Sequence, residues 1–378
     1  MCSLRMSGFS AMIAGEGEGA SKTMTTPWSV GEEVPVAPAE SAEPTSAMLG
    51  DVLHVVWSHN RMLHHAWRDA EGWSQPTPVA YGEQPALAAA GERLHCLFSA
   101  QFMRNYEIYH VAWDGVRWSL PVNVSSTYGV SRHPVLAAGS DGVLHAAWAD
   151  TTPGYSTIYY GTRGATFWAN RPVPSGRGIM PAIAVAPDGA VYIAWSDRRS
   201  DTGAYDVYCA LYRDNIWYPP ESVSDSATAD SLYPQLAIDA RGVCHIIWSE
   251  DNGETCRIYH ADRRPQGWAK PTDVSQADAD LGLARLAINP FGFVHVFWSD
   301  GATIHHRIKP QAFDAAWRSS ELVTPNFAEP SALSPALSAS RRAHVVWCGR
   351  DAAGSCRLFH VERTPFPSPS VFLPIVFR

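Results

Sequence analysis

The sequence predicts an all-β fold: a seven-bladed β-propeller of four-stranded antiparallel blades, closed by an N-terminal strand that completes the last blade. Three observations predict it: a recurring strand motif, a steady spacing between its copies, and a spare strand near the N-terminus. The aromatic residues that close successive copies lie between 41 residues (Trp57 to Phe98) and 53 residues (Trp195 to Trp248) apart, the period of propeller blades. The Leu-His-x-x-Trp-like copies are 53–57, 94–98, 144–148, 191–195, 244–248, 294–298 and 343–347.

Each repeat also contains three other extended segments. The first is rich in alanine, which suits a strand near a crowded central axis, and it begins at Pro44, Pro85, Pro134, Pro181, Pro234, Ala284 or Pro335. The third resembles Ile-Tyr-His and spans 63–65, 108–110, 158–160, 207–209, 258–260, 304–306 or 358–360. The fourth opens with Trp73, Trp118, Trp168, Trp217, Trp268 or Trp317 and contains proline. Proline cannot donate to a strand ladder, so the fourth segment is predicted to be the outer edge strand.

The seventh repeat lacks a fourth segment. Ser368 stands where the pattern requires tryptophan, eight residues after His360. A spare segment of this type, WSVGEEVPV, occupies residues 28–36. We therefore expect the N-terminal strand to complete blade seven and to remove the open seam of the ring.

The chain has 378 residues and divides into three predicted parts. Residues 1–25 form an extension that is predicted to be disordered and shows no clear signal peptide. Residues 26–362 form the propeller. Residues 363–378 form a Pro/Ser linker and a short apolar tail, which either docks on the propeller or serves as a sorting tag.

Composition and residue spacing exclude several classes of partner and cofactor. The net charge is −8 and no basic block is present, which argues against nucleic-acid binding. No apolar run approaches 18 residues, so no membrane span is predicted. No cofactor is predicted, because no cysteine and histidine spacing is typical of zinc sites. The 15 tryptophans fall mostly into the second-strand and fourth-strand series, so we interpret them as packing between blades.

Repeated histidines and cysteines have structural interpretations. Histidine recurs in the second segment (His54, His95, His145, His245, His295, His344) and at the end of the third (His65, His110, His260, His306, His360). We expect these rings to be interior and hydrogen-bonded rather than metal ligands, because each faces its own blade neighbours. Cys96, Cys209 and Cys244 are predicted to be buried and unreactive. Cys348 and Cys356 flank one hairpin and are a candidate disulfide.

Candidate ligand-binding residues lie in loops that share one face of the ring. In a propeller, the hairpins between second and third strands and the connections between blades meet at the mouth of the central channel. The richest such loop carries Asp197, Arg198, Arg199, Asp201 and Asp206. The other candidates are Arg132, His133, Arg177, Glu250 and Asp251. They indicate a polar mouth that recognises a sugar or an anionic group. The alternative is that the acidic residues cap turns and the arginines pair with neighbouring blades.

The blade pattern over residues 26–362, with Asp197-Arg198-Arg199, resembles the sialidase-like, BNR-repeat propellers. The enzymes of that group use an arginine triad for the substrate carboxylate, a Tyr–Glu nucleophile pair and an aspartate as general acid/base. The resemblance also implies an extracellular or cell-surface location. Those enzymes carry an Arg-Ile-Pro motif and several Ser-x-Asp-x-Gly-x-x-Trp boxes. This chain has no Arg-Ile-Pro motif, and its closest match to the box, residues 114–118, is one residue short. Sialidases have six blades, whereas seven repeats are present here. The tail at 371–378 resembles the Leu-Pro ends of exported Chloroflexi proteins.

Three functions follow from these observations. The first is a non-catalytic binding propeller for a glycan or a protein partner. The second is a sialidase-type glycoside hydrolase, which requires two carboxyl groups about 5 Å apart if it retains configuration. Its candidate carboxyl groups are Asp197, Asp201, Asp206 and Glu250. The third is a structural subunit of a surface assembly, and the oligomeric state is left open.

Overall fold

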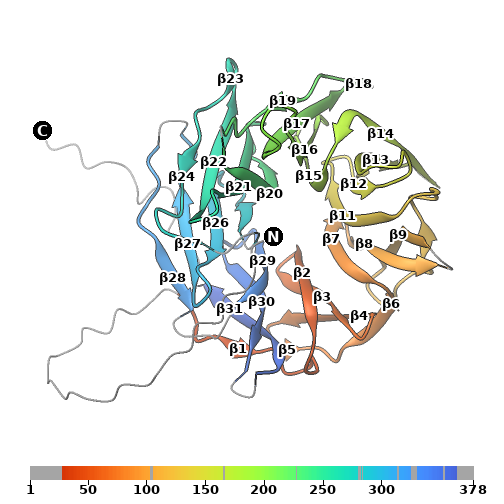
Figure 1. The fold of residues 1–378 in the computed structure, drawn as a ribbon. Helices are drawn as coiled ribbons and strands as arrows, with labels where there is room; N and C mark the ends of the chain where they lie inside the picture. Colours follow the sequence, from red (N-terminus) through yellow and green to blue (C-terminus); the bar gives the residue numbers. More distant parts are fainter. Residues whose placement is uncertain are drawn as a thin grey trace, which may run out of the picture.

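The computed structural model describes residues 28–102, 105–164, 167–226, 228–279, 282, 284–312, 315–324, 330–351 and 354–363. These residues form seven antiparallel sheets arranged in a ring (Figure 1), which confirms the predicted seven-bladed, all-β propeller. No described segment forms a helix, and none is therefore a helix long and apolar enough to cross a membrane. The predicted extension 1–25 and residues 364–378 of the tail lie outside the described residues.

Each blade follows the strand order of the sequence from the axis outward. The innermost strands are β2 (Ala42–Leu49), β7 (Glu83–Ala90), β11 (Ser131–Ala138), β15 (Ile179–Val185), β20 (Asp230–Ile238), β25 (Arg285–Ile288) and β29 (Ser331–Leu337). The second strands are β3 (Val52–His59), β8 (Arg93–Phe102), β12 (Leu144–Asp150), β16 (Val191–Arg198), β21 (Cys244–Asp251), β26 (Val294–Ser299) and β30 (Ala343–Arg350). The third strands are β4 (Met62–Asp69), β9 (Asn105–Trp113), β13 (Thr157–Arg163), β17 (Tyr205–Arg213), β22 (Cys256–Arg264), β27 (Ile304–Lys309) and β31 (Cys356–Arg363). We number the blades 1 to 7 in this order.

The outer strands differ from the single strand expected after each tryptophan. In blades 1, 4 and 5 the outer strand is split in two: β5 (Gly72–Trp73) and β6 (Thr77–Tyr81), β18 (Ile216–Trp217) and β19 (Glu221–Ser222), β23 (Gly267–Trp268) and β24 (Thr272–Asp273). Each break contains proline, which cannot donate a backbone hydrogen bond. Blade 2 has β10 (Val122–Asn123), blade 3 has β14 (Trp168–Arg177) and blade 6 has β28 (Glu321–Thr324). Trp118 and Trp317 therefore precede their outer strands instead of opening them.

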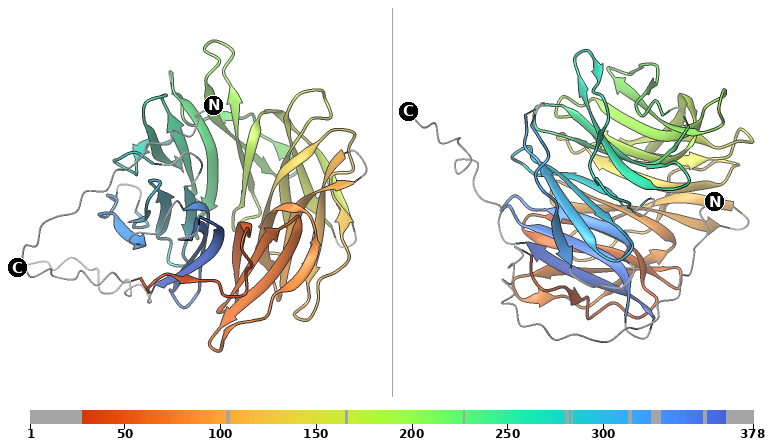
Figure 2. Two further views of the ribbon diagram at one scale, coloured as in Figure 1. Left: turned by 60° about the horizontal axis from the view of Figure 1, so that its bottom comes forward. Right: turned by 60° about the vertical axis from the view of Figure 1, so that its left-hand side comes forward.

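The N-terminal strand closes the ring, as the spare segment predicts. The strand β1 (Glu32–Glu33) pairs antiparallel with β31, with Glu32 opposite His360, and Trp28 forms a further bridge with Arg363. Val34 is fully buried between blades 7 and 1. In Figure 2 the red N-terminal strand lies beside the blue C-terminal strands. The first and last described segments therefore share one sheet.

The repeated histidines form pairs inside the blades. The pairs are His54–His65, His95–His110, His245–His260, His295–His306 and His344–His360, with Nδ1 3.0–3.1 Å from Nε2. In blade 3 the second partner is Tyr160, whose hydroxyl lies 2.7 Å from Nδ1 of His145. The interpretation of these histidines as interior, hydrogen-bonded groups is confirmed.

A tryptophan from the next blade packs edge-on against each of these pairs. The contacts are Trp118 on His65, Trp168 on His110, Trp317 on His260, Trp28 on His306 and Trp73 on His360, with ring centroids 5.1–5.5 Å apart. Trp217 makes the same contact with Tyr160. The tryptophan and histidine series in the sequence are thus two halves of one contact between blades.

Candidate functional site

One face of the ring gathers the loops that the sequence analysis singled out. Because strands alternate in direction, the hairpins between second and third strands and the connections between blades end at the same edge. We call this edge the mouth face. On it Arg132 stacks on Tyr106, with its guanidinium carbon 3.5 Å from the ring centroid. Arg177 lies 5.0 Å from the ring of Tyr155 in the same way. Arg198 lies 5.0 Å from the ring of Tyr205, so three predicted arginines each cover a tyrosine.

A pocket of about 400 Å³ opens on the mouth face between blades 1 and 2. We call it the mouth pocket. Tyr81 in its wall is 74% exposed. Glu83 forms an ion pair with Arg132, the residue that backs Tyr106. The lining residues are Arg61, Tyr81, Gly82, Glu83, Ser99, Ala100, Gln101 and Tyr106. The pocket thus combines aromatic rings with polar groups.

The inner strands add a second set of side chains to this face. Near the start of six inner strands the register shifts by a β-bulge. One residue in each bulge has positive φ (51° to 56°): Glu43, Gln84, His133, Met180, Tyr233 and Ala332. Bulges re-aim side chains and are common beside functional sites. Here the bulges lie at the mouth-face ends of the inner strands in six of the seven blades.

Three of these bulge residues contact one another around the ring. Glu43 Oε2 accepts the backbone N–H of Gln84 at 2.7 Å, and the side chain of Gln84 lies 3.2 Å from Nδ1 of His133. Burial raises the pKa of Glu43 above its usual value. His133 was a sequence candidate, whereas Glu43 and Gln84 were missed. The signal that would have found them is their position directly before the proline of the first segment.

The predicted loop of blade 4 is an ion-pair network. Arg199 contacts Asp201 at 3.0 Å and Asp206 at 3.3 Å. Asp206 is 2% exposed and accepts hydrogen bonds from Ser224 Oγ and the N–H of Ser226. These contacts tie the hairpin to its outer strand, which favours the structural alternative for these three residues.

The remaining candidate acids serve different roles. Asp251 accepts the N–H of Gly253 within a hairpin turn. Burial raises the pKa of Asp197, although the charge of Arg177 opposes the shift. Burial also raises the pKa of Glu250, whose Oε2 accepts the indole N–H of Trp248 at 3.3 Å. Asp197 and Glu250 are therefore the two candidate acids whose protonation the fold perturbs upward.

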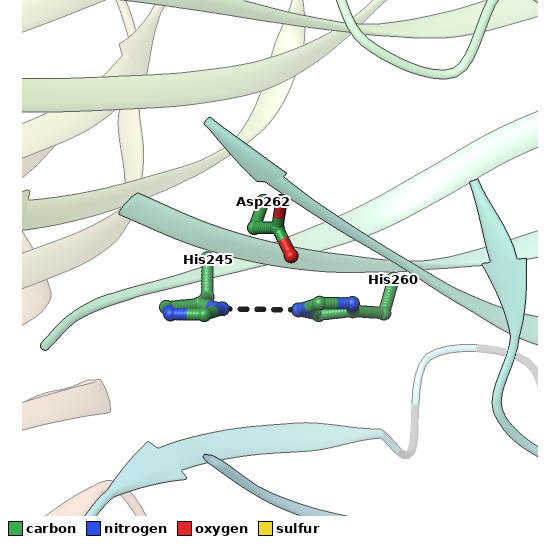
Figure 3. A group of neighbouring side chains, drawn as sticks. All are labelled: His245, His260 and Asp262. Carbon is green, nitrogen blue, oxygen red and sulfur yellow. Dashed lines mark hydrogen bonds between the residues drawn. The ribbon is translucent and has the colours of Figure 1, made fainter. Parts of the chain in front are cut away.

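A group with metal-ligand chemistry lies in blade 5. His245, His260 and Asp262 have potential ligand atoms within 4.8 Å of one another (Figure 3). However, the two rings already share the hydrogen bond found in four other blades. Asp262 is occupied by Lys309 and by Arg264, each at 2.8 Å. Two cations beside the carboxylate disfavour a third, so we assign this group a structural role.

The cysteines lie apart from the mouth pocket. Cys348 and Cys356 form a disulfide across the hairpin of blade 7. Cys96, Cys209 and Cys244 are buried, and burial raises the pKa of the Cys96 thiol to about 12. Burial raises the thiol pKa of Cys209 and Cys244 in the same direction, so all three are unreactive packing residues.

Solved structures share this fold at low sequence identity. A family PL25 polysaccharide lyase, an ulvan lyase bound to -[GlcA(1-4)Rha3S]-, has a TM-score of 0.59 at 10% identity, covering 85% of this chain and 94% of that one. The GH93 α-L-arabinofuranosidase of Fusarium graminearum with arabinobiose has 0.50 at 13%, covering 74% and 92%. A fungal alcohol oxidase of the AA5 family with copper has 0.60 at 13%, covering 92% and 78%.

These likenesses show the fold alone. No protein-family model and no curated protein matches the sequence, so no match supports the sialidase-like resemblance. Two of the three proteins act on carbohydrates according to their descriptions, and the third is an oxidase. The function of this chain therefore depends on its own site residues.

Proposed function

We propose that this protein is a non-catalytic, carbohydrate-binding propeller that holds an oligosaccharide in the mouth pocket. The observation that carries the proposal is the pairing of an exposed Tyr81 with an arginine-backed Tyr106 in one pocket on the mouth face. Aromatic faces pack against the C–H faces of sugars, and nearby polar groups bind sugar hydroxyls. Glu83, Gln101 and Arg61 supply such groups.

The platform is held in place before a ligand arrives. Arg132 lies over the ring of Tyr106 and is itself fixed by its ion pair with Glu83. A ring held from behind loses little freedom when a sugar packs on its front, which favours binding. A peptide partner is an extended chain and would need a longer groove. A compact sugar ring therefore fits a pocket of about 400 Å³ better.

The binding prediction is tested on an array of neutral and acidic oligosaccharides, followed by calorimetry on the ligand found. Tyr81→Ala is expected to weaken binding about tenfold, since a lost aromatic contact is worth about 1.4 kcal/mol. Tyr106→Ala is expected to weaken it more, because Arg132 also loses its stacking partner. The matched control is Tyr128→Ala, a fully exposed tyrosine outside the lining of the pocket. Unchanged binding by both pocket variants would contradict the proposal.

A hydrolase is the second candidate, favoured by the raised pKa of Asp197 and of Glu250. A carboxyl group with a raised pKa suits general-acid catalysis. The binding proposal predicts no turnover of a fluorogenic sialoside by the wild-type protein. Turnover that disappears in Asp197→Asn or Glu250→Gln, with folding intact by circular dichroism, would replace the binding proposal by the hydrolase.

A further inference from the structure

A second pocket lies on the outer wall between blades 5 and 6, apart from the mouth pocket. It has a volume of about 430 Å³. Its walls come from β22, from residues 269–276 of the outer strand region of blade 5, from β27, and from residues 315–317. Residues 262–264 and 315–317 lie toward the turns opposite the mouth face. We call it the outer pocket.

Basic side chains gather in the outer pocket although the protein is acidic overall. Four basic residues line it: Arg264, Lys270, Arg307 and Lys309. Only two acidic residues do so, Asp262 and Asp273. The whole sequence has three lysines, and two of them are here. A local excess of positive charge in a chain of net charge −8 therefore marks this pocket.

The acidic residues of the pocket already have cationic partners. Asp262 pairs with Lys309 and with Arg264, each at 2.8 Å. Asp273 pairs with Arg257 at 3.2 Å. Among the described residues, no carboxylate lies within ion-pair distance of Arg307 or Lys270. Within the described chain, neither side chain therefore has an ion-pair partner, although Asp273 lies close enough to Arg307 to stabilise its charge in part.

Arg307 is the group that most needs an anion. It is 6% exposed, and its guanidinium donates to the carbonyl oxygens of Arg318 and Val274 at 2.7 and 2.6 Å. These bonds fix the guanidinium but do not neutralise it. Burial lowers the pKa of Arg307, and the charge of Asp273, which is itself paired with Arg257, opposes this shift only in part. A bound oxyanion would supply the missing charge and accept the remaining N–H groups.

We propose that the outer pocket binds the sulfate or phosphate ester group of a small ligand, with Arg307 and Lys270 as its direct contacts. Lys309 adds positive charge behind them while it stays paired with Asp262. Ala315, Ala316 and Trp317 form the adjoining wall, against which the carbon skeleton of the ligand packs. This proposal does not rest on the carbohydrate proposal for the mouth pocket, because the two pockets share no residue.

The test is calorimetry at low ionic strength with glucose 6-sulfate, glucose 6-phosphate, glucuronate and glucose. Binding of one or both esters and not of glucose is expected, and the two ester arms identify which oxyanion is preferred. Lys270→Gln, at an exposed position that should not disturb folding, is expected to weaken ester binding about tenfold. Arg307→Gln is expected to abolish it. The matched control is Arg117→Gln, which removes an exposed arginine in blade 2.

Several outcomes would overturn the proposal. These are equal binding of glucose and the esters, binding of glucuronate alone, no binding of any compound, or unchanged ester binding in Lys270→Gln. If Arg307→Gln fails to fold, Lys270→Gln still decides. Ester binding that survives in Tyr106→Ala is also expected, which separates this pocket from the mouth pocket.

Discussion

Acidification from pH 7 to pH 4.5 is expected to unfold the propeller cooperatively. Burial lowers the pKa of His54, His95 and His344 to about 4, and that of His65 and His110 to about 3. Burial also lowers the pKa of His260, His295 and His360 well below the usual value. The unfolded chain protonates these histidines near pH 6.5. The folded state is therefore fully favoured above pH 6.5 and loses stability as the pH falls toward 4.

The magnitude follows from the number of pairs. Each histidine that protonates only in the unfolded state costs about 1.4 kcal/mol of stability per pH unit. If one ring of each of the five pairs behaves this way, the loss is about 7 kcal/mol per pH unit, comparable to the whole stability of a typical domain. Urea unfolding by circular dichroism at pH 7.0, 6.5, 6.0 and 5.5 measures the slope.

Two variants test whether the pH dependence of stability comes from the histidine pairs. His95→Gln removes one titrating ring, so its stability should fall less steeply with pH, whatever its stability at pH 7. His59→Gln, in the hairpin of blade 1, is the matched control from outside the five pairs. A free energy of unfolding that stays constant from pH 7.0 to 5.5 would contradict the account of the histidine pairs.

Trp28→Ala is expected to destabilise the protein by about 3–5 kcal/mol, the usual cost of removing a large buried aromatic side chain. Trp28 is 5% exposed and packs edge-on against Phe297 and His306 of blade 6, with ring centroids 6.1 and 5.5 Å away. It also anchors the strand that closes the ring by its bridge to Arg363. Its loss therefore weakens both the blade 6–7 contact and the closure.

The control for this variant is Val30→Ala, two residues away and 91% exposed. It should change the free energy of unfolding by less than about 0.5 kcal/mol. Chemical denaturation at pH 7 compares the two variants. Equal effects of the two substitutions would mean that the N-terminal segment does not lock the ring.

The ring and its closure were predictable because they depend on local, repeated signals. The second-strand motif gives the register of each blade, and Trp28 stands in the spacing of the outer-strand tryptophans. The tryptophan that packs on each histidine pair was not predictable, because it comes from the neighbouring blade. Trp73, for example, meets His360 only when the ring closes. The split outer strands depend on where proline falls against the ladder, which the period alone does not fix.

The candidate site was predictable only in part. Arg132, His133, Arg177 and Arg198 were found because hairpins and blade connections share a face. Arg198 and Tyr205 face each other within one hairpin, and Arg177 and Tyr155 both belong to blade 3. The contact between Arg132 and Tyr106 and the mouth pocket instead depend on the angle between neighbouring blades, which no motif encodes. Asp206 carries a carboxylate in a promising loop, yet its burial and its serine partner give it a structural role. Glu43 and Gln84 were not predicted, because the bulges that contain them appear only in the structure.

The central claim is that a glycan occupies the mouth pocket, and a hydrogen-exchange footprint with the array ligand at saturation tests it most directly. The account predicts slower amide exchange in peptides that cover residues 60–62, 81–84 and 99–101, with no change in blades 5 and 6. Slower exchange confined to other blades would contradict it. An array on which no glycan binds would contradict it as well.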